Sequence, residues 1–462
     1  MKNYAITKIG QHRSAPRVWL QGRHPESAGF LPTTRFTVEV KKEKGMIALR
    51  AVATGERKVS SKEVSGRTVP IIDINSREIL SIFEGMEQIR VIAAKGVIYL
   101  LPLATEVRRQ ERLARLKNKL AKQAPLSVGS VSHGGGVLSL ALHQGLAEGH
   151  TPSRLAFAND IRGDLLEHAA QANPAWDSQT IALASPMQEL AYDQWAMAHI
   201  PSIDILEGGI PCEGASVSGR SKRGTGCAEE HPLVGHLVAG FLAIIAKVNP
   251  SIVIMENVVP YQSTASMWIL RHSLRDMGYD VHETILDGAE FNALEHRQRM
   301  CLVAVTQGIE FDFSALVKPK PTSRYLGDIL ENIPEDAPCW SEMGYLKDKE
   351  KRDAQAGKGF VMQIVTPDST KVGTIGKGYN KNRSTEPKVA HPTNPSLLRL
   401  LTPREHARCK GIPECLVEGL AATTAHELLG QSIVFDAFHA VGRLIADTLQ
   451  EWVSLNGQQQ AA

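Results

Sequence analysis

The residue with the clearest chemical potential is Cys212, which follows an apolar run and two glycines in the segment IDILEGGIPCEGAS. In an open α/β sheet, ligands bind beyond the carboxyl ends of the strands, and this cysteine is expected at such an end. A thiolate becomes a strong nucleophile once nearby cations lower its pKa. A single cysteine after a strand is also a common inert thiol, so its role depends on the residues that accompany it.

Two further segments place charged side chains at expected strand ends. Glu256 follows the apolar run SIVIM, where partial desolvation would let a carboxylate share a proton with a ring nitrogen. Arg297 and Arg299 alternate in EHRQR, so on a strand they would point the same way and could hold a phosphate or a carbonyl oxygen. A helix cap and a surface ion pair are the structural alternatives for these residues.

A glycine-rich turn lies between an expected strand and an expected helix in the segment VSHGGGV. At Gly134, Gly135 and Gly136 the backbone can approach a ligand closely, although glycine turns are common. Asp160 ends the next expected strand, where a carboxylate can accept hydrogen bonds from ribose hydroxyls. These residues indicate where a ribose-bearing cofactor would bind.

The elements that would position these residues alternate between apolar strands and helices from Pro125 onward. Such alternation is typical of a doubly wound, mostly parallel α/β sheet. Residues 310–396 interrupt it with many Gly, Pro, Lys and Asn. The predicted divisions are a β-rich domain at 1–103, a basic linker helix at 104–123, a catalytic domain at 124–309, an inserted module at 310–396 and a return to the catalytic domain at 397–462.

The order of these segments resembles that of the DNA cytosine-5 methyltransferase family. The glycine turn, the acidic strand end, the PC loop, ENV and the paired arginines are followed by a variable basic module, RLLTPREHAR and LLGQS. The resemblance covers residues 125–450. It implies a Rossmann-like methyltransferase fold with a small target-recognition domain at 310–396, and S-adenosyl-L-methionine as the cofactor.

The resemblance also implies a role for each residue. Cys212 would add to C6 of a cytosine flipped out of double-stranded DNA, while Glu256 holds N3 and the exocyclic amine. Arg299 would bind the cytosine O2, and Arg297 would steady the active-site loop or a phosphate. C5 then takes the methyl group, and loss of its proton releases the cysteine by β-elimination. The implied cofactor-binding residues are Val131, Gly134, Gly135, Gly136, Asp160, Pro211, Gly430, Gln431 and Ser432.

Two basic segments are expected to contact DNA. The loop after Cys212 is rich in Gly and Ser and suits a mobile lid, although a plain exposed loop fits the same composition. The module at 310–396 occupies the place of the family's target-recognition region, and its glycines suit either close approach to a groove or ordinary turns. The predicted DNA contacts are Arg220, Lys222, Arg223, Lys377, Lys381 and Arg383.

Several positions depart from the family's pattern. They are Val131 for a phenylalanine that packs on adenine, His133 for glycine, Glu213 for glutamine, Glu295 for glutamine and Gln431 for asparagine. No acidic residue near 184–185 matches the one expected at the adenine amine. These changes affect the cofactor contacts more than the base chemistry, so we expect an active enzyme.

Residues 1–103 contain two strand–turn–strand units of similar length, which indicates a weak internal duplication. The segment RVWLQGRHPESAGFLPTTRFTVEV, followed by a glycine turn and a strand, resembles the swapped-hairpin DNA-binding domains of the AbrB and SymE-like group. That resemblance implies DNA binding and a homodimer through this domain, and a structural cap is the alternative. The helix at 104–123 has a narrow leucine stripe among basic side chains, which predicts a solvated face or a DNA contact.

The composition sets broad limits on function. With 43% hydrophobic and 22% charged residues, the chain can bury a large core. No apolar run approaches the ~20 residues of a membrane span, the N-terminus has no secretion signal, and the cysteines lack zinc spacing. We therefore expect a cytoplasmic protein without a structural metal. Methylation of tRNA cytosine, and a non-catalytic DNA-binding regulator on a methyltransferase scaffold, are the alternatives.

Overall fold

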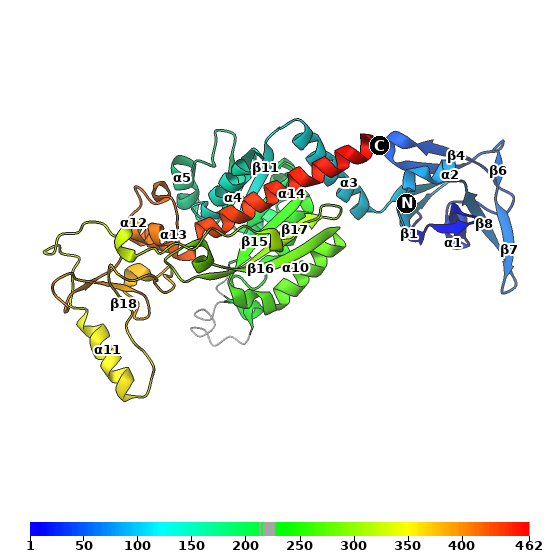
Figure 1. Cartoon of the computed structure of the whole chain (residues 1–462). Helices are drawn as coiled ribbons and strands as arrows, with labels where there is room; N and C mark the ends of the chain where they lie inside the picture. The colour runs from blue at the N-terminus through cyan, green and yellow to red at the C-terminus, as the bar shows by residue number, and fades with distance from the viewer. Residues whose placement is uncertain (212–213, 216–226, 462) are drawn as a thin grey trace. The chain divides into compact units, whose positions relative to one another are not determined.

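The computed structural model of the chain describes residues 1–211, 214–215 and 227–461 (Figure 1). The chain divides into two compact units, Met1–Glu111 and Arg112–Ala462. The division falls within α3 (Ala104–Ala121), the helix that the sequence predicts as a separate linker. The second half of this helix belongs to the larger unit.

The larger unit is built on a seven-stranded sheet in the order β13-β12-β11-β14-β15-β17-β16. Its strands are β11 (Leu126–Val131), β12 (Ser153–Asp160), β13 (Ile181–Ala184), β14 (Ile205–Gly208), β15 (Ile252–Asn257), β16 (Tyr279–Asp287) and β17 (Gln298–Thr306). The strands β11 to β15 pair in parallel, whereas β17 is antiparallel to both of its neighbours. The predicted doubly wound, mostly parallel sheet is confirmed, and β13 is a strand that the sequence analysis did not predict.

Helices cover both faces of this sheet, which explains why its central strands are continuously apolar. Along β15, Ile252 and Ile254 belong to one buried cluster and Val253 and Met255 to the other, because successive side chains point to opposite faces. The helices on the first face include α4 (Val137–Glu148), α5 (Gly163–Ala172) and α14 (Phe435–Ala461). Those on the second face include α6 (Met187–Tyr192), α9 (Leu237–Val248) and α10 (Ala265–Asp276).

The long helix α14 packs closely against α4. A Cβ atom at Gly145 would lie 2.1 Å from the His439 carbonyl oxygen, so only glycine allows the two backbones to approach this closely.

No single helix in the described part of the chain is long and apolar enough to cross a membrane. The pair Ala422–Gln431 and Phe435–Leu455 meets that length and composition test only together, across a 48° bend.

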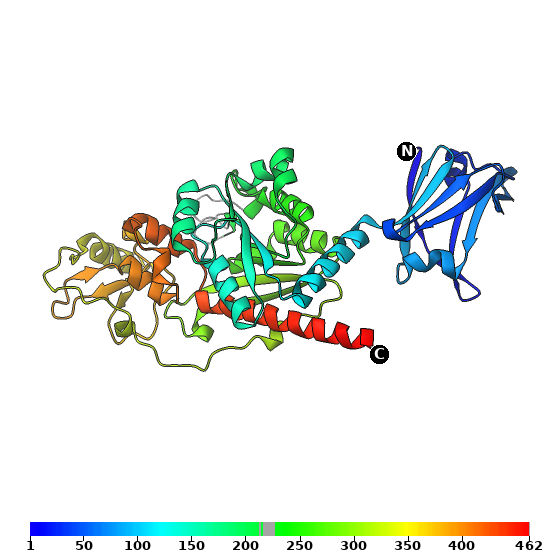
Figure 2. The same cartoon turned by 90° about the horizontal axis from the view of Figure 1, so that it is seen from above.

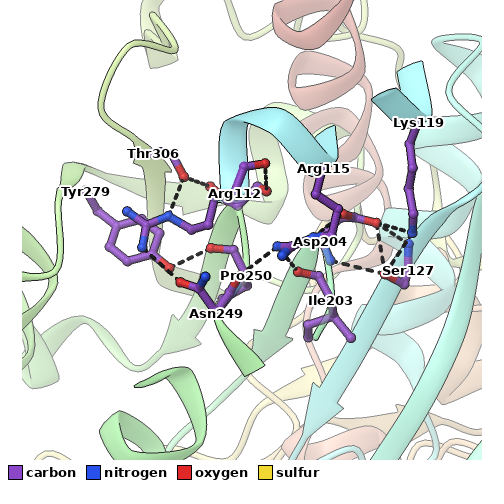
Figure 3. A network of polar contacts seen from close by, with 11 residues as sticks. Arg112, Arg115, Lys119, Ser127, Ile203, Asp204, Asn249, Pro250, Tyr279 and Thr306 are labelled. Carbon is purple, nitrogen blue, oxygen red and sulfur yellow. Dashed lines mark hydrogen bonds and ion pairs between the residues drawn. The ribbon is translucent and has the colours of Figure 1, made fainter. Parts of the chain in front are cut away.

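The second half of α3 is anchored to the larger unit by Arg112 (Figure 3). This side chain is 1% exposed. Its guanidinium donates to Thr306 Oγ1 at 2.9 Å and to the Met277 carbonyl at 2.9 Å, and it stacks over the Tyr279 ring at 4.1 Å. An arginine buried in this way orients the helix, because each of its donors meets an acceptor fixed by the fold.

Two further basic side chains of α3 bind one buried carboxylate, Asp204. Arg115 Nε lies 3.0 Å and Lys119 Nζ 2.5 Å from its two oxygens, and the amide of Ser127 donates to it at 2.8 Å (Figure 3). These contacts outweigh the desolvation of Asp204 and lower the pKa of its carboxyl. The interpretation of the helix as a solvated face or a DNA contact is therefore wrong for Arg112, Arg115 and Lys119.

The inserted module forms a small lobe at the end of the larger unit opposite α3 (Figure 2). It contains α11 (Gly344–Gln355) and a three-stranded sheet of β18 (Ile364–Val365), β19 (Lys388–Ala390) and β20 (Leu398–Arg399). Its buried cluster includes Leu401 and Cys409 as well as residues before 396. The lobe therefore extends into α12 (Pro403–Cys409), beyond the boundary predicted at residue 396.

The smaller unit consists of two antiparallel sheets with the strand orders β1-β9-β10-β5-β4-β6 and β2-β3-β8-β7. The strands are β1 (Asn3–Lys8), β2 (Gly10–His12), β3 (Ala15–Gln21), β4 (Arg35–Lys41), β5 (Met46–Ala51), β6 (Arg57–Lys58), β7 (Ser60–Val64), β8 (Arg67–Asn75), β9 (Gln88–Ala94) and β10 (Val97–Pro102). One buried cluster lies between the sheets, together with the short helices α1 (Arg23–Ser27) and α2 (Arg77–Leu80). The β-rich character predicted for this region is confirmed.

Candidate active site and cofactor site

The carboxyl end of β15 brings together two of the predicted catalytic side chains. Glu256 is opposite Cys301 in the antiparallel pairing with β17, which places it next to Arg299 on that strand. Arg299 Nε lies 2.8 Å from Glu256 Oε1, and both side chains are mostly buried. Burial raises the pKa of the Glu256 carboxyl, and the charges of Arg299 and Arg297 oppose part of this rise. The pair presents a carboxyl and a guanidinium side by side.

The loop that carries Cys212 begins beside this pair. A Cβ atom at Gly209 would lie 3.1 Å from the carbonyl oxygen of Glu256, so glycine permits the close passage of the two strand ends. The side-chain amide of Asn257 donates to the Ile210 carbonyl at 2.9 Å and holds the loop in place. Pro211 continues this loop and is partly exposed. Cys212 and Glu213 lie outside the described residues.

Arg297 lies in different surroundings from Arg299. It comes just before β17 begins and is 2% exposed. It donates to the Gly430 carbonyl at 3.0 Å, and its guanidinium is 3.2 Å from Glu295 Oε1. Burial, followed by the charge of Arg299, lowers the pKa of Arg297 to about 10. These contacts make Arg297 a positioning residue that joins the arginine segment to the segment LLGQS.

Glu295, one of the departures from the family's pattern, is matched by a buried lysine. Both Glu295 and Lys410 are 0% exposed, and Lys410 Nζ lies 3.2 Å from Glu295 Oε2. The other carboxylate oxygen accepts from the Ile375 amide at 3.0 Å. Burial lowers the pKa of Lys410 to about 7. The carboxylate thus bridges the small lobe and the arginine segment, and Lys410 offsets its charge.

The glycine turn after β11 is tied to the end of β12. The Gly134 amide donates to Asp160 Oδ2 at 2.7 Å, and the Arg162 amide donates to Oδ1 at 2.8 Å. Gly134 and Gly136 have positive φ angles of 55° and 73°. A Cβ atom at Gly134 would meet nothing within 4 Å, so the turn has open space beside it. Asp160 keeps further lone pairs for ribose hydroxyls, and the arrangement fits a ribose-bearing cofactor.

Two apolar residues near this turn differ in exposure, and only Val131 was predicted to bind the cofactor. Val131 is 0% exposed and belongs to a buried cluster, so its side chain is not open to a ligand. Ile161 is 70% exposed and directly follows Asp160. Sequence analysis missed Ile161, although an apolar residue after an acidic strand end was the signal available. Its side chain leaves an exposed apolar surface beside Asp160.

A buried polar chain lies beneath the glycine turn. His133, which replaces the usual glycine, accepts from Trp176 Nε1 at 3.0 Å, and its Nδ1 is 2.8 Å from Ser130 Oγ. Burial lowers the pKa of His133 to about 3, so the ring is neutral. Glu207 interacts with Ser130, is 2% exposed, and burial raises its pKa to about 7. Glu207 was missed, although a carboxylate within the apolar run of IDILEGG could have indicated it.

The segment LLGQS closes against the small lobe. A Cβ atom at Gly430 would lie 2.2 Å from the Lys377 amide nitrogen, so the two backbones touch. Gln431 is exposed, and Ser432 Oγ donates to the Leu428 carbonyl at 2.7 Å. Leu428 also contacts the glycine turn, since a Cβ atom at Gly135 would lie 2.4 Å from its Cδ1 atom. Gly135 and LLGQS are therefore neighbours in the fold.

The predicted DNA contacts divide into two groups. Lys377, Lys381 and Arg383 are exposed on the small lobe. Their loop is held next to Arg297, whose guanidinium contacts the Ile375 carbonyl at 3.5 Å. Lys388 of the same module is instead 0% exposed and donates to the Glu386 carbonyl. Arg220, Lys222 and Arg223 lie outside the described residues.

Cysteines and metal ligands show little clustering. The cysteines within the described ranges are Cys227, Cys301, Cys339, Cys409 and Cys415, and all are free thiols. Across those same ranges, no three His, Cys, Asp or Glu side chains are grouped so that they could hold a metal ion.

The chain is similar to known methyltransferases over its larger unit. The family model described as C-5 cytosine-specific DNA methylase matches residues 182–447. The Type II methyltransferase M1.ScrFI of Lactococcus lactis subsp. cremoris is 26% identical over 262 residues, covering 54% of this chain and 64% of that protein. M.MspI of Moraxella sp is 28% identical over 256 residues, covering 54% of this chain and 58% of that protein. Each match thus spans less than two thirds of the relative.

Solved structures support the fold. The crystal structure of the S. pombe Dnmt2 methyltransferase has a TM-score of 0.52 and 21% identity, and the match covers 71% of this chain and 99% of that one. The Entamoeba histolytica methyltransferase EhMeth has a TM-score of 0.52 at 15% identity, covering 72% and 98%. Because the family model matches more than half of the sequence, the chain belongs to the C-5 cytosine-specific DNA methylase family.

Proposed function

We propose that the chain transfers a methyl group from S-adenosylmethionine to C5 of a flipped-out cytosine in double-stranded DNA. The observation that carries this proposal is the Glu256–Arg299 pair at the strand end beside the loop of Cys212. A carboxyl and a guanidinium at 2.8 Å match the N3, amine and O2 edge of cytosine. The family model described as C-5 cytosine-specific DNA methylase favours DNA as the substrate.

The proposed chemistry begins with the thiolate of Cys212, which forms a bond to C6 and moves an electron pair toward C5. Glu256, whose pKa is raised by burial, shares a proton with N3 and stabilises the resulting enamine. Arg299 holds O2 and the position of Glu256. The bound cofactor supplies an electrophilic methyl group to C5. A base then removes the C5 proton, and the C6–S bond breaks to restore the thiolate.

Cys212 can be tested by trapping the covalent adduct. With DNA containing 5-fluorocytosine, C5 carries no proton to lose, so we expect a protein–DNA adduct that survives denaturation. Cys212→Ala should form no adduct and show no tritiated-methyl transfer, whereas Cys227→Ala, which changes an exposed thiol, should retain both. Methylation by Cys212→Ala would contradict the mechanism. Transfer to tRNA in place of DNA would favour the RNA alternative.

The cofactor site can be tested by calorimetry with S-adenosylmethionine. Asp160→Ala removes a carboxylate proposed to bind ribose, and a lost hydrogen bond to a charged group predicts an affinity decrease of about 10- to 100-fold. Asp164→Ala is the matched control, because this nearby carboxylate is exposed and pairs with Arg162. Equal affinities for wild type and Asp160→Ala would reject the assignment. Absence of any binding by the wild type would favour the non-catalytic regulator.

We also propose that Lys377, Lys381 and Arg383 contact DNA from the small lobe, together with Arg220, Lys222 and Arg223 from the loop after Cys212. The first three are exposed on a loop bonded to Arg297, which supports their access to a duplex held at the catalytic pair. Bisulfite sequencing of a host that expresses the protein would identify the methylated sequence.

A further inference from the structure

The smaller unit repeats one order of elements twice. Its first half runs β1-β2-β3-α1-β4-β5 and its second half β6-β7-β8-α2-β9-β10. The elements correspond in order, so that β1 matches β6 and β5 matches β10. Replacing each strand label by that of its counterpart gives the same strand order in both sheets, read from the other end. The halves therefore build each sheet together, with β3 against β8 and β5 against β10 at the centre. This arrangement is expected when a two-fold axis relates the halves.

The strand register supports the same axis. In the β3–β8 pairing Trp19 is opposite Asp73, and each lies four residues before the arginine that begins its half's helix, Arg23 or Arg77. In the β5–β10 pairing Ala48 is opposite Tyr99. Those two residues each lie three positions after the turn glycine of their hairpin, at 45 and 96. Both central pairings are thus centred on equivalent residues.

The two halves share one core. Phe30 and Phe83 lie at matching positions after the two helices and are 0% and 2% exposed. Leu49 and Leu100 also match and are both fully buried. The strand pairing that would join two chains in a homodimer therefore joins the two halves of one chain here.

Charge separates this region from the rest of the chain. Residues 1–103 contain 17 Lys and Arg against 9 Asp and Glu, whereas residues 104–462 contain 35 against 40. A positive excess confined to one region is the electrostatic signature of a nucleic-acid-binding surface.

Part of this positive charge lies on the outer face of the six-stranded sheet. Paired residues in antiparallel strands point to the same face, and the opposite face of this sheet is buried in the core. Along the strand direction the outer basic residues form two groups of three, one toward each end of the strands: Lys8, Lys41 and Arg90, and Arg35, Arg50 and Lys58. Glu39 is the acidic residue on the strands of this face and pairs with Arg50 and Lys41.

Lys8 and Lys58 are the outermost equivalent pair. Each is opposite the first residue of the neighbouring strand, Gln88 in β9 and Arg35 in β4, and both lysines are exposed. Their strands β1 and β6 are five strand spacings apart, about 24 Å. The registers also place the two lysines toward opposite ends of the strands, so the lysines are farther apart than this lateral spacing. This span reaches beyond a major groove about 12 Å wide, so phosphates on both sides are within range.

We propose that this face is a second DNA-binding site. One chain binds a duplex there, and the two-fold axis that relates the halves of the smaller unit coincides with a local two-fold axis of the DNA. The occupant follows from the charge and from the symmetry, since duplex DNA carries phosphates related by such axes. The site goes beyond methyl transfer, because it requires neither Cys212 nor the cofactor.

The test uses the full chain and a fluorescent duplex of only adenine and thymine, which offers no cytosine to flip. Lys8→Gln and Lys58→Gln should each weaken binding about eightfold at about 0.1 M salt and lower the salt slope by about 0.9, because each removes one phosphate contact. The two variants should match each other. Lys62→Gln, which changes an exposed lysine on β7 of the other sheet, should bind as the wild type does.

Other outcomes would overturn the proposal. These are an unchanged affinity in both variants, an equal loss in Lys62→Gln, or tighter binding of single-stranded RNA than of duplex. A solution mass of two chains that falls to one when residues of this face are changed would show that a second copy covers it. In a chain that also carries Cys212→Ala, Lys8→Gln and Lys58→Gln should still weaken duplex binding. This result would separate the second site from the methyl-transfer proposal.

Discussion

Glu256→Gln is expected to lower kcat for methyl transfer by about 10²- to 10⁴-fold, the range of general acid–base catalysis. The amide keeps the shape of the side chain but cannot transfer a proton to N3. Because Glu256 is largely buried next to Arg299, its replacement should change chemistry more than DNA affinity. Tritiated-methyl transfer under single-turnover conditions would measure the effect, and Glu290→Gln, an exposed carboxylate paired with Lys318, is the control.

The pH profile gives a second readout for the same residue. Burial raises the pKa of Glu256, so a reaction that needs its protonated form should lose rate as the pH rises through that pKa. Removing the opposing charge in Arg299→Ala should raise the pKa further and move this loss of rate to higher pH. A shift to lower pH, or a rate in Glu256→Gln close to that of the wild type, would contradict the role.

Arg112→Ala is expected to lower the free energy of unfolding by about 3 kcal/mol or more, because removing its donors breaks a buried hydrogen-bond network and leaves buried acceptors unpaired. The substitution leaves Thr306 and the Met277 carbonyl without their donor and opens a space beside Tyr279. Urea unfolding of the full chain, followed by the fluorescence of the larger unit, would measure the loss. Lys122→Ala, which changes an exposed lysine just after α3, should change stability by less than about 0.5 kcal/mol. Equal losses in the two variants would refute the anchoring role.

Sequence patterns predicted the parts of the fold that depend on local order. The apolar runs and glycine turns gave the larger sheet, and a charged residue at each strand end indicated Glu256 and Arg299. The role of α3 could not be predicted in this way. Its leucine stripe and basic residues are those of an exposed helix, whereas Arg112 finds its acceptor at Thr306, far along the chain.

The departures from the family's pattern show a similar limit. Glu295 is a fully buried carboxylate, and the fold supplies Lys410 as a second cation beside it in addition to Arg297. His133 is accommodated because Trp176 and Ser130 supply a donor and a partner for a neutral ring. Compensating pairs of this kind depend on tertiary contacts, which spacing along one sequence does not reveal.

Joining the two halves of the smaller unit in one chain also frees them to differ. A homodimer must present two identical surfaces, because both come from one sequence. Here Arg50 stands at the position that Leu101 occupies in the other half, and Arg90 at the position of Thr37. A covalently joined unit can therefore match a DNA site whose two half-sites have unlike sequences, without a second protein.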